Sequence, residues 1–562
     1  MKIISKLSFI IVVAALFTAC KKSNTIGKLI PKDAAAVFHV DGKSILSKIS
    51  WNDIKNNPLL KDSADINALP ASLKKILENP DSTGIDTKSD LVFFMMKDTS
   101  GSYLGFEGNI KDAATFKAFN TQLIEKGTAS ESDGLNFISK NPISLGWSKD
   151  KFVYVFDLPQ MQQSAKDSDE MNTDSKPSAT RDMAAICKSI FLLKENNSLA
   201  VDERFTNLLS ESGDFHFWMN AESLYKDMFN NNPAMAMINL EKLYKGSVTT
   251  GTANFDNGKI NINFSSYAGE EITKLYKKYS GSKINEDMIN RLPSKNVDVF
   301  MAMNFKPEGL REFLKLLNLD GLLNIGLTSL GFGMDDFIKA NKGDILFAVS
   351  DFKMVADTTQ LPETETPVVN VFSTKPDFNY IFSASVGDKN AFNKLINAGK
   401  KAGGAFLSEK NSTIAYQSND TYFAIGNTKA TVDNYFAGGN TNAALLSKIS
   451  GSSFGGYVNI QSLLKAFETE ASKDSSGKVI YDASVKLWDN ITIKGGELKN
   501  NAITQTFEIN LVDKSTNSLQ QLNQYAIKLS EIIIAKQKKQ KEDMMAFEDA
   551  MPIPPTATVK EK

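Results

Sequence analysis

The stretch Val37-Phe38-His39-Val40-Asp41-Gly42-Lys43-Ser44-Ile45-Leu46 decides the fold class of this chain. It begins as a short apolar strand, and the Asp at its end closes the strand through a side-chain turn. Ser44 then supplies an N-cap oxygen for the first unpaired amides of a helix. A strand that leads directly into a capped amphipathic helix predicts a fold that mixes strands and helices.

The same strand-to-helix pattern recurs in residues 217–225, 299–310 and 457–464. Further matches link the two halves of the chain in the same order. Residues 88–93 match 342–347, Asp112 with Phe116 matches Asp388 with Phe392, and the hairpin at 255–260 matches 498–503. One such match could arise by chance, but five in the same order indicate a tandem duplication.

Strands often follow strands directly in this sequence, with hairpin turns at 98–101 and at Asn257-Gly258. This favours an α+β fold with largely antiparallel sheets and helices packed on one face. The sequence therefore predicts two tandem, internally duplicated α+β domains and a C-terminal helix. The predicted bounds are a first repeat at 30–282, a second at 283–514, an amphipathic helix at 515–550 and a disordered tail at 551–562.

The first residues predict a lipoprotein signal peptide at 1–19. Lys2 and Lys6 precede an apolar run too short to span a bilayer, and Phe17-Thr18-Ala19-Cys20 resembles a lipobox. We expect Cys20 to carry acyl chains, with residues 20–29 as a tether. By analogy with lipoprotein sorting, Lys21 in place of Asp points to the outer membrane. The lack of an acidic patch after Cys20 favours the periplasmic side, with the cell surface as the alternative.

Composition excludes several classes of protein. The net charge is −1, and the arginines Arg181, Arg204, Arg291 and Arg311 lie far apart in sequence. Recognition of phosphate favours clustered arginine, so no nucleic-acid partner is expected. Cys187 is the only cysteine besides Cys20. It has no disulfide partner in the mature chain, and its apolar surroundings predict a small buried hydrophobe.

The sequence offers few residues for catalysis. The only histidines are His39 and His216. Aligning the repeats places His39 opposite Trp218 and His216 opposite Val37, which predicts that the histidines lie on alternate faces. We therefore expect neither a zinc site nor a serine–histidine triad. Phosphate-loop and dinucleotide motifs are also missing. No catalytic residue, metal or cofactor is predicted, although a pair of carboxylates stays open.

Residues 30–37, Ile-Pro-Lys-Asp-Ala-Ala-Ala-Val, follow the lipobox and precede an expected helix from Asp41 to Trp51. With this arrangement the chain resembles an uncharacterised lipoprotein family of the Bacteroidetes group. The resemblance implies a membrane address and no known activity. The length is also similar to that of starch-uptake lipoproteins, but those are almost wholly helical.

The leading hypothesis is a non-enzymatic binding or scaffolding lipoprotein of the cell envelope. Its partners would be the membrane, through the N-terminal lipid, and a protein or ligand in the groove between the two repeats. The alternative is a carboxylate-based hydrolase acting on envelope glycans or peptides, and a structural spacer is the third hypothesis.

Overall fold

The computed structural model describes residues 26–58, 78–98, 101–159, 181–230, 238–357, 374–403 and 414–550. The chain divides into two compact units. Unit 1 comprises Met1–Ile45, Asp81–Asn254 and Phe264–Thr273, and unit 2 comprises Leu46–Pro80, Phe255–Asn263 and Lys274–Lys562. Five elements contain residues of both units, namely α2 (Gly42–Lys48), the 3-10 helix η1 (Pro80–Thr83), β9 (Val248–Asp256), β10 (Lys259–Tyr267) and α12 (Glu270–Tyr279).

Unit 1 contains one antiparallel sheet in the order β9-β8-β1-β2-β3-β7-β6-β5-β4. Its strands are β1 (Ala36–Asp41), β2 (Asp90–Asp98), β3 (Gly101–Asn109), β4 (Thr128–Ser132), β5 (Leu135–Lys140), β6 (Ile143–Trp147), β7 (Lys151–Pro159), β8 (Phe215–Asn220) and β9 (Val248–Asp256). Its helices are α7 (Ala113–Leu123), α8 (Met183–Phe191), α9 (Glu203–Ser210), α10 (Ala221–Asn230) and α11 (Glu241–Tyr244).

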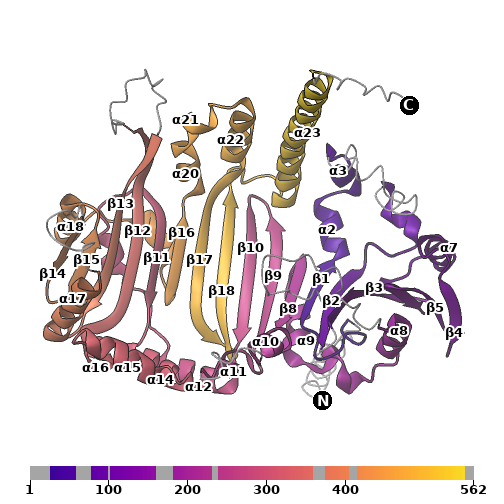
Figure 1. Cartoon of the computed structure of the whole chain (residues 1–562), viewed down its shortest axis with the longest axis horizontal. Coiled ribbons are helices and arrows are strands. Elements are labelled where there is room, and N and C mark those ends of the chain that lie inside the picture. The colour runs from indigo at the N-terminus through magenta and orange to yellow at the C-terminus, as the bar shows by residue number, and fades with distance from the viewer. Residues whose placement is uncertain are drawn as a thin grey trace, which may run out of the picture. The chain divides into compact units, whose positions relative to one another are not determined.

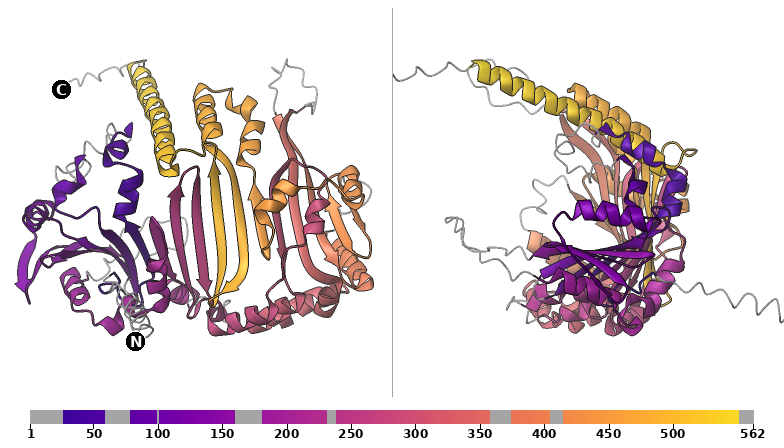
Figure 2. Two further views of the ribbon diagram at one scale, coloured as in Figure 1. Left: turned by 180° about the vertical axis from the view of Figure 1, so that it is seen from behind. Right: turned by 90° about the vertical axis from the view of Figure 1, so that its right-hand side faces the viewer.

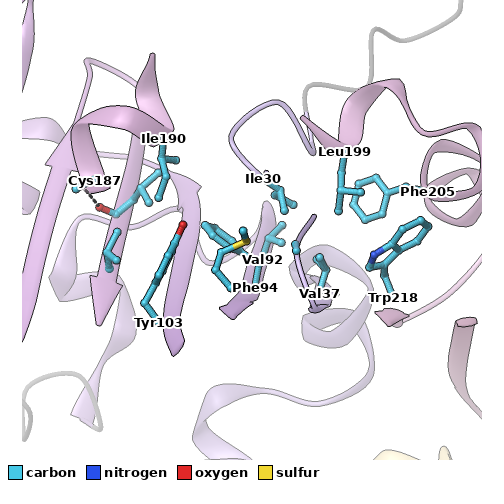
Figure 3. Packing of buried hydrophobic residues seen from close by; sticks show 14 of the residues in the cluster. Ile30, Val37, Val92, Phe94, Tyr103, Cys187, Ile190, Leu199, Phe205 and Trp218 are labelled. Atoms are coloured by element: carbon cyan, nitrogen blue, oxygen red, sulfur yellow. Dashed lines mark hydrogen bonds between the residues drawn. The ribbon is translucent and has the colours of Figure 1, made fainter. Parts of the chain in front are cut away.

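Helices pack on both faces of this sheet, so the prediction of helices on one face is wrong for unit 1. On the face that we call the α8 face, Val153 and Val155 join a core with Cys187 of α8 and Phe205 of α9. Figure 3 shows part of this core, including Phe205 beside Trp218. On the opposite α7 face, the neighbouring β7 residues Phe152 and Tyr154 pack against α7. Because the β7 sequence is apolar at successive positions, both faces of the sheet need cover.

Unit 2 contains an antiparallel sheet in the order β18-β17-β16-β11-β12-β13-β15-β14. Its strands are β11 (Val297–Asn304), β12 (Asn341–Ala356), β13 (Thr374–Val386), β14 (Ala415–Ser418), β15 (Tyr422–Gly426), β16 (Phe454–Val458), β17 (Trp488–Lys499) and β18 (Ala502–Leu511). Figure 1 shows β12 and β13 as the longest pair in the outer part of this sheet, with α17 and α18 beside it.

The helices of unit 2 are α3 (Trp51–Lys55), α13 (Glu286–Asn290), α14 (Pro307–Leu316), α15 (Asp320–Ser329), α16 (Met334–Ala340), α17 (Lys389–Gly403), α18 (Lys429–Phe436), α19 (Ala443–Ile449), α20 (Ile460–Ala466), α21 (Glu468–Ala471), α22 (Ser475–Leu487) and α23 (Ser518–Ala550). They also lie on both faces of their sheet. Phe382 and Ala384 of β13 join a cluster with Phe392 of α17, whereas Ile381 joins a cluster on the other face with Leu445 of α19. Helices α14, α15 and α16 form a row beside one end of β11 to β13 (Figure 2).

All four strand-to-helix motifs contain a strand followed by a helix, but the predicted capping atom is wrong. Ser44 does not cap α2 with its side chain. Instead its backbone N–H donates to the Asp41 carboxylate at 2.8 Å. Asn459 accepts in the same way from Ser462 N–H at 3.0 Å. Asn220 accepts likewise from Ser223 N–H at 3.2 Å, so in three motifs the Asp or Asn at the end of the strand is the N-cap, because its short side chain reaches the amide three residues later. The fourth differs, because Asn304 accepts from Ser282 N–H instead and α14 begins after Lys306 without a side-chain cap.

The expected helix from Asp41 to Trp51 is interrupted. Helix α2 ends at Lys48, and α3 begins at Trp51 after Ser50. Ser50 and Asp53 form a capping box in which each side chain accepts from the other residue's backbone N–H. A capping box at this position starts a new helix rather than continuing the previous one.

Two predicted hairpins form where expected. Asp98 pairs with Gly101 in β2 and β3, and Lys499 pairs with Ala502 in β17 and β18. Asn500 and Asn501 both have positive φ, at 50° and 64°, as a two-residue turn between right-twisted strands requires. The mixed fold with antiparallel sheets is therefore confirmed, whereas the tandem duplication stays a prediction.

Helix α23 packs against its own unit through its first half. Tyr525 forms an edge-to-face contact with Trp488, at 6.0 Å between ring centres, and a 2.8 Å hydrogen bond with Ser484 of α22. Figure 2 shows that α23 then continues beyond α22. Among the described residues, no helix is both long and apolar enough to cross a membrane.

Candidate functional sites

An apolar opening in the described part of unit 2 lies between α17 and the sheet. This cavity, which we call the apolar pocket, has a volume of about 440 Å³. Its floor is a row of cross-strand neighbours, Ile345 of β12, Ala384 of β13 and Phe423 of β15. Volumes of this size are typical of small-molecule sites.

Helix α17 forms the opposite wall. Asp388 accepts a hydrogen bond from Ala391 N–H at 2.8 Å and so fixes the start of the helix. The residues that face the pocket follow at three- and four-residue spacing, namely Phe392, Leu395, Ile396 and Gly399. At Gly399 an added Cβ would meet no atom within 4 Å. The apolar stripe thus ends in a residue without a side chain, and the pocket is open there.

The lining has little polar character. Asn341 is one polar member, and its Nδ2 already donates to Phe337 O at 2.7 Å. The others are Lys400 and Tyr416, and Lys400 Nζ lies 5.0 Å from the centre of the Tyr416 ring. None of the described residues that line the pocket is acidic. The arrangement is suited to holding an apolar molecule rather than to acid–base chemistry.

A second candidate site in unit 1 contains both histidines. The prediction that they lie on alternate faces is wrong, because His39 of β1 and His216 of β8 are direct register partners. Both rings are buried, and their Nδ1 atoms are 3.0 Å apart. His39 Nε2 lies 2.9 Å from Asp90 Oδ1, and His216 Nε2 lies 3.0 Å from Glu211 O. We call this row the histidine chain.

The number of protons in the histidine chain follows from its geometry. Its three contacts need three protons, whereas two neutral imidazole rings supply one N–H each. The fully bonded chain therefore contains one imidazolium balanced by the Asp90 carboxylate. Burial lowers the pKa of His216, the Glu211 carbonyl opposes this, and charge on His39 lowers it further. With His216 neutral, its Nδ1 accepts from His39 Nδ1 and its Nε2 donates to Glu211 O.

Ser44 lies near this chain but does not form a catalytic triad with it. Its Oγ donates to Asp214 Oδ1 at 2.6 Å. All four ring nitrogens of the two histidines already have the partners given above. A serine nucleophile needs a histidine nitrogen within hydrogen-bonding distance, and here that nitrogen is engaged elsewhere. The histidine chain is therefore a buried structural network.

The sequence leaves a pair of carboxylates as the open possibility for catalysis. Burial raises the pKa of Glu107 in β3 to about 7, and Lys151 opposes the shift. In the polar hollow beside α16, Asp335 pairs with Arg311. There Lys394 lowers the pKa of Asp336, which is unsuited to a general acid. No group of three or more His, Cys, Asp or Glu that could hold a metal occurs among the described residues.

The structure describes only one of the two cysteines. Cys20 lies outside the described residues, so its lipidation stays a prediction. Cys187 is buried, and its Sγ donates to Val153 O at 3.5 Å (Figure 3). Burial raises the pKa of this thiol to about 12. A thiol held protonated in a core is unreactive at neutral pH.

Comparison with known proteins gives a family without an activity. No curated protein matches the chain. Crystal forms I and III of TP0453 are similar to it in part, both at a TM-score of 0.26. Form I has 11% identity and covers 44% of this chain and 81% of that chain, and form III has 10% identity and covers 49% and 90%. The family described as "Domain of unknown function (DUF4836)" matches residues 27–360, more than half of the sequence, and the chain belongs to this family.

Proposed function

We propose that this chain is a non-enzymatic, lipid-anchored binding protein of the outer membrane that faces the periplasm and holds an apolar ligand in the apolar pocket of unit 2. The pocket is the observation that carries the proposal. Its floor and wall are apolar side chains, and its opening lies at Gly399. Burial of each ligand methylene in such a site contributes about 0.8 kcal/mol.

Hydrolysis of envelope glycans or peptides has less support. A glycosidase needs two carboxyl groups on either side of the scissile bond. The described residues that line the apolar pocket include neither Asp nor Glu. The ligand site of the proposal also differs from the groove between repeats that the sequence predicted, and that groove stays a prediction.

Binding is tested with Nile red, an apolar dye whose emission rises in apolar surroundings. Gly399→Trp places an indole at the opening of the pocket and should abolish saturable binding. Gly326→Trp is the matched control, because Gly326 is also an exposed glycine within a helix whose added Cβ would meet no atom within 4 Å. Equal binding by both variants and the wild type would contradict the proposal.

Anchoring is tested separately in cells fed radiolabelled palmitate. The Cys20→Ala variant should lose the label and leave the membrane fraction, because Cys20 is the predicted acylation site. Cys187→Ala should keep both the label and the membrane location. Protease added to intact cells should leave the wild-type protein intact if it faces the periplasm, whereas cleavage would place it on the cell surface.

A further inference from the structure

We propose that the ligand of the apolar pocket is a single-chain acidic amphiphile, a long-chain fatty acid, whose carboxylate lies against Lys400. This inference rests on the proposed function and names its ligand class. Lys400 is the only charged residue among the described residues that line the pocket.

The position of Lys400 carries the argument. It follows Gly399 in α17, so the charge lies at the opening while the apolar stripe of the helix leads inward. Its Nζ lies 5.0 Å from the Tyr416 ring centre, and attraction to the ring face favours this placement of the ammonium. Tyr416 is 38% exposed, so this side of the opening is accessible to solvent.

The rest of the lining explains why the ligand has one polar end. The amide of Asn341 already donates to Phe337 O, so the interior offers apolar contacts with Ile345, Phe382 and Phe423. Burying a polar group there without a partner would oppose binding. A ligand therefore gains most when its chain enters the pocket and its charged end stays beside Lys400.

The neighbouring lysine provides a matched control. Lys401 has the same charge and lies in the same last turn of α17. A Cβ added to Gly331, in the turn after α15, would lie 3.7 Å from Lys401 Nζ, and Lys401 is not among the lining residues. A general effect of positive charge on this helix would involve both lysines, whereas contact with the headgroup involves Lys400 alone.

The experiment measures binding of palmitic acid and of hexadecanol, which has the same chain length and no charge, to the full mature chain. The wild type should bind the acid more tightly. Lys400→Met keeps the apolar stem and should weaken binding of the acid about fivefold, the size expected for loss of one partly exposed charge contact. The same variant should leave binding of the alcohol unchanged, and Lys401→Met should change neither. Lauric, myristic and palmitic acids should bind in increasing order, about fourfold per methylene.

The outcomes separate this inference from the proposed function. Equal binding of acid and alcohol, unaffected by Lys400→Met but abolished by Gly399→Trp, would overturn the headgroup assignment and leave the apolar site in place. Binding of neither compound, with no effect of Gly399→Trp on Nile red, would overturn the proposed function as well.

Discussion

His39 Nδ1 lies 3.0 Å from His216 Nδ1 in the interior of unit 1, although the residues are 177 positions apart in sequence. The pair continues on one side to the Asp90 carboxylate and on the other to the Glu211 carbonyl. Since every contact in this row needs a proton, the arrangement contains one more proton than two neutral rings carry. A strand-to-strand hydrogen bond in the core thus depends on a titratable group.

The first prediction concerns the titration of His216. Burial lowers its pKa, so the folded state gives up this proton at a lower pH than the unfolded chain, whose histidines titrate near about 6.5. Because the unfolded state binds more protons in that interval, His216 makes folding less favourable as the pH falls below about 6.5. The chain has only two histidines, so NMR of their ring protons resolves both. Titration of His216 at or above 6.5 would contradict the assignment.

A double-mutant cycle tests whether the histidines act as a pair. His39→Phe leaves the buried His216 Nδ1 without its partner and should lower the free energy of unfolding by about 1–3 kcal/mol. The variant with both His39→Phe and His216→Phe should lose less than the sum of the single changes, because neither buried Nδ1 atom then remains without the other. Urea unfolding gives the free energy of unfolding for the two single variants and the double variant. Strict additivity would mean that the contact contributes nothing.

The helix caps predict different effects on stability for substitutions of Asn459 and Ser462. Asn459→Ala removes the side chain that accepts from Ser462 N–H, and it should cost about 1 kcal/mol. Ser462→Ala keeps that backbone N–H and should change stability by less than about 0.5 kcal/mol. Thermal and urea unfolding compare the two variants. A larger loss of stability for Ser462→Ala than for Asn459→Ala would mean that the serine side chain caps the helix.

Buried Glu107 makes stability depend on pH in the opposite direction to His216. Its pKa is raised to about 7 by burial, so the folded state holds this proton at pH values where the unfolded chain has lost it. Stability from this group is present at acid pH and is lost as the pH rises through about 7. Glu107→Gln should therefore stabilise the protein at pH 8 by roughly 3 kcal/mol.

The control for Glu107 is Glu131→Gln on the exposed strand β4. This change should leave unfolding by urea nearly the same at pH 5 and at pH 8. If Glu107→Gln also had equal effects at both pH values, the carboxyl group would not be buried as described.

Local features of this fold follow from the sequence, whereas long-range register does not. The caps at Asp41, Asn220 and Asn459 and the turn at Asn500-Asn501 are local, and the residues alone indicated them. Alignment of the repeats placed His39 opposite Trp218, but the antiparallel register of β1 and β8 pairs His39 with His216. Similarity between two segments carries no information about how they pair across a sheet.

The two-sided cover of the unit 1 sheet has a local sequence signal, whereas the apolar pocket has none. Residues 152–156, Phe-Val-Tyr-Val-Phe, are apolar at every position, which is the signal for a strand buried on both faces. The pocket combines Ile345, Phe392 and Phe423 from separate parts of the chain, and no local spacing relates them. In the sequence alone, Gly399 is only a residue of low helix propensity. Its position at the opening of the pocket becomes evident only when the strands opposite α17 are in place.

The central claim, that the apolar pocket of unit 2 holds an apolar ligand, is tested most directly by photoaffinity labelling. A palmitic acid that carries a diazirine near the end of its chain is crosslinked to the full mature protein, and the labelled peptides are identified by mass spectrometry. We predict labels in α17 and in β13 or β15, which form the wall and floor of the pocket, and their loss in Gly399→Trp but not in Gly326→Trp. Labels spread over other elements, or labels in α17 that persist unchanged in Gly399→Trp, would contradict the account.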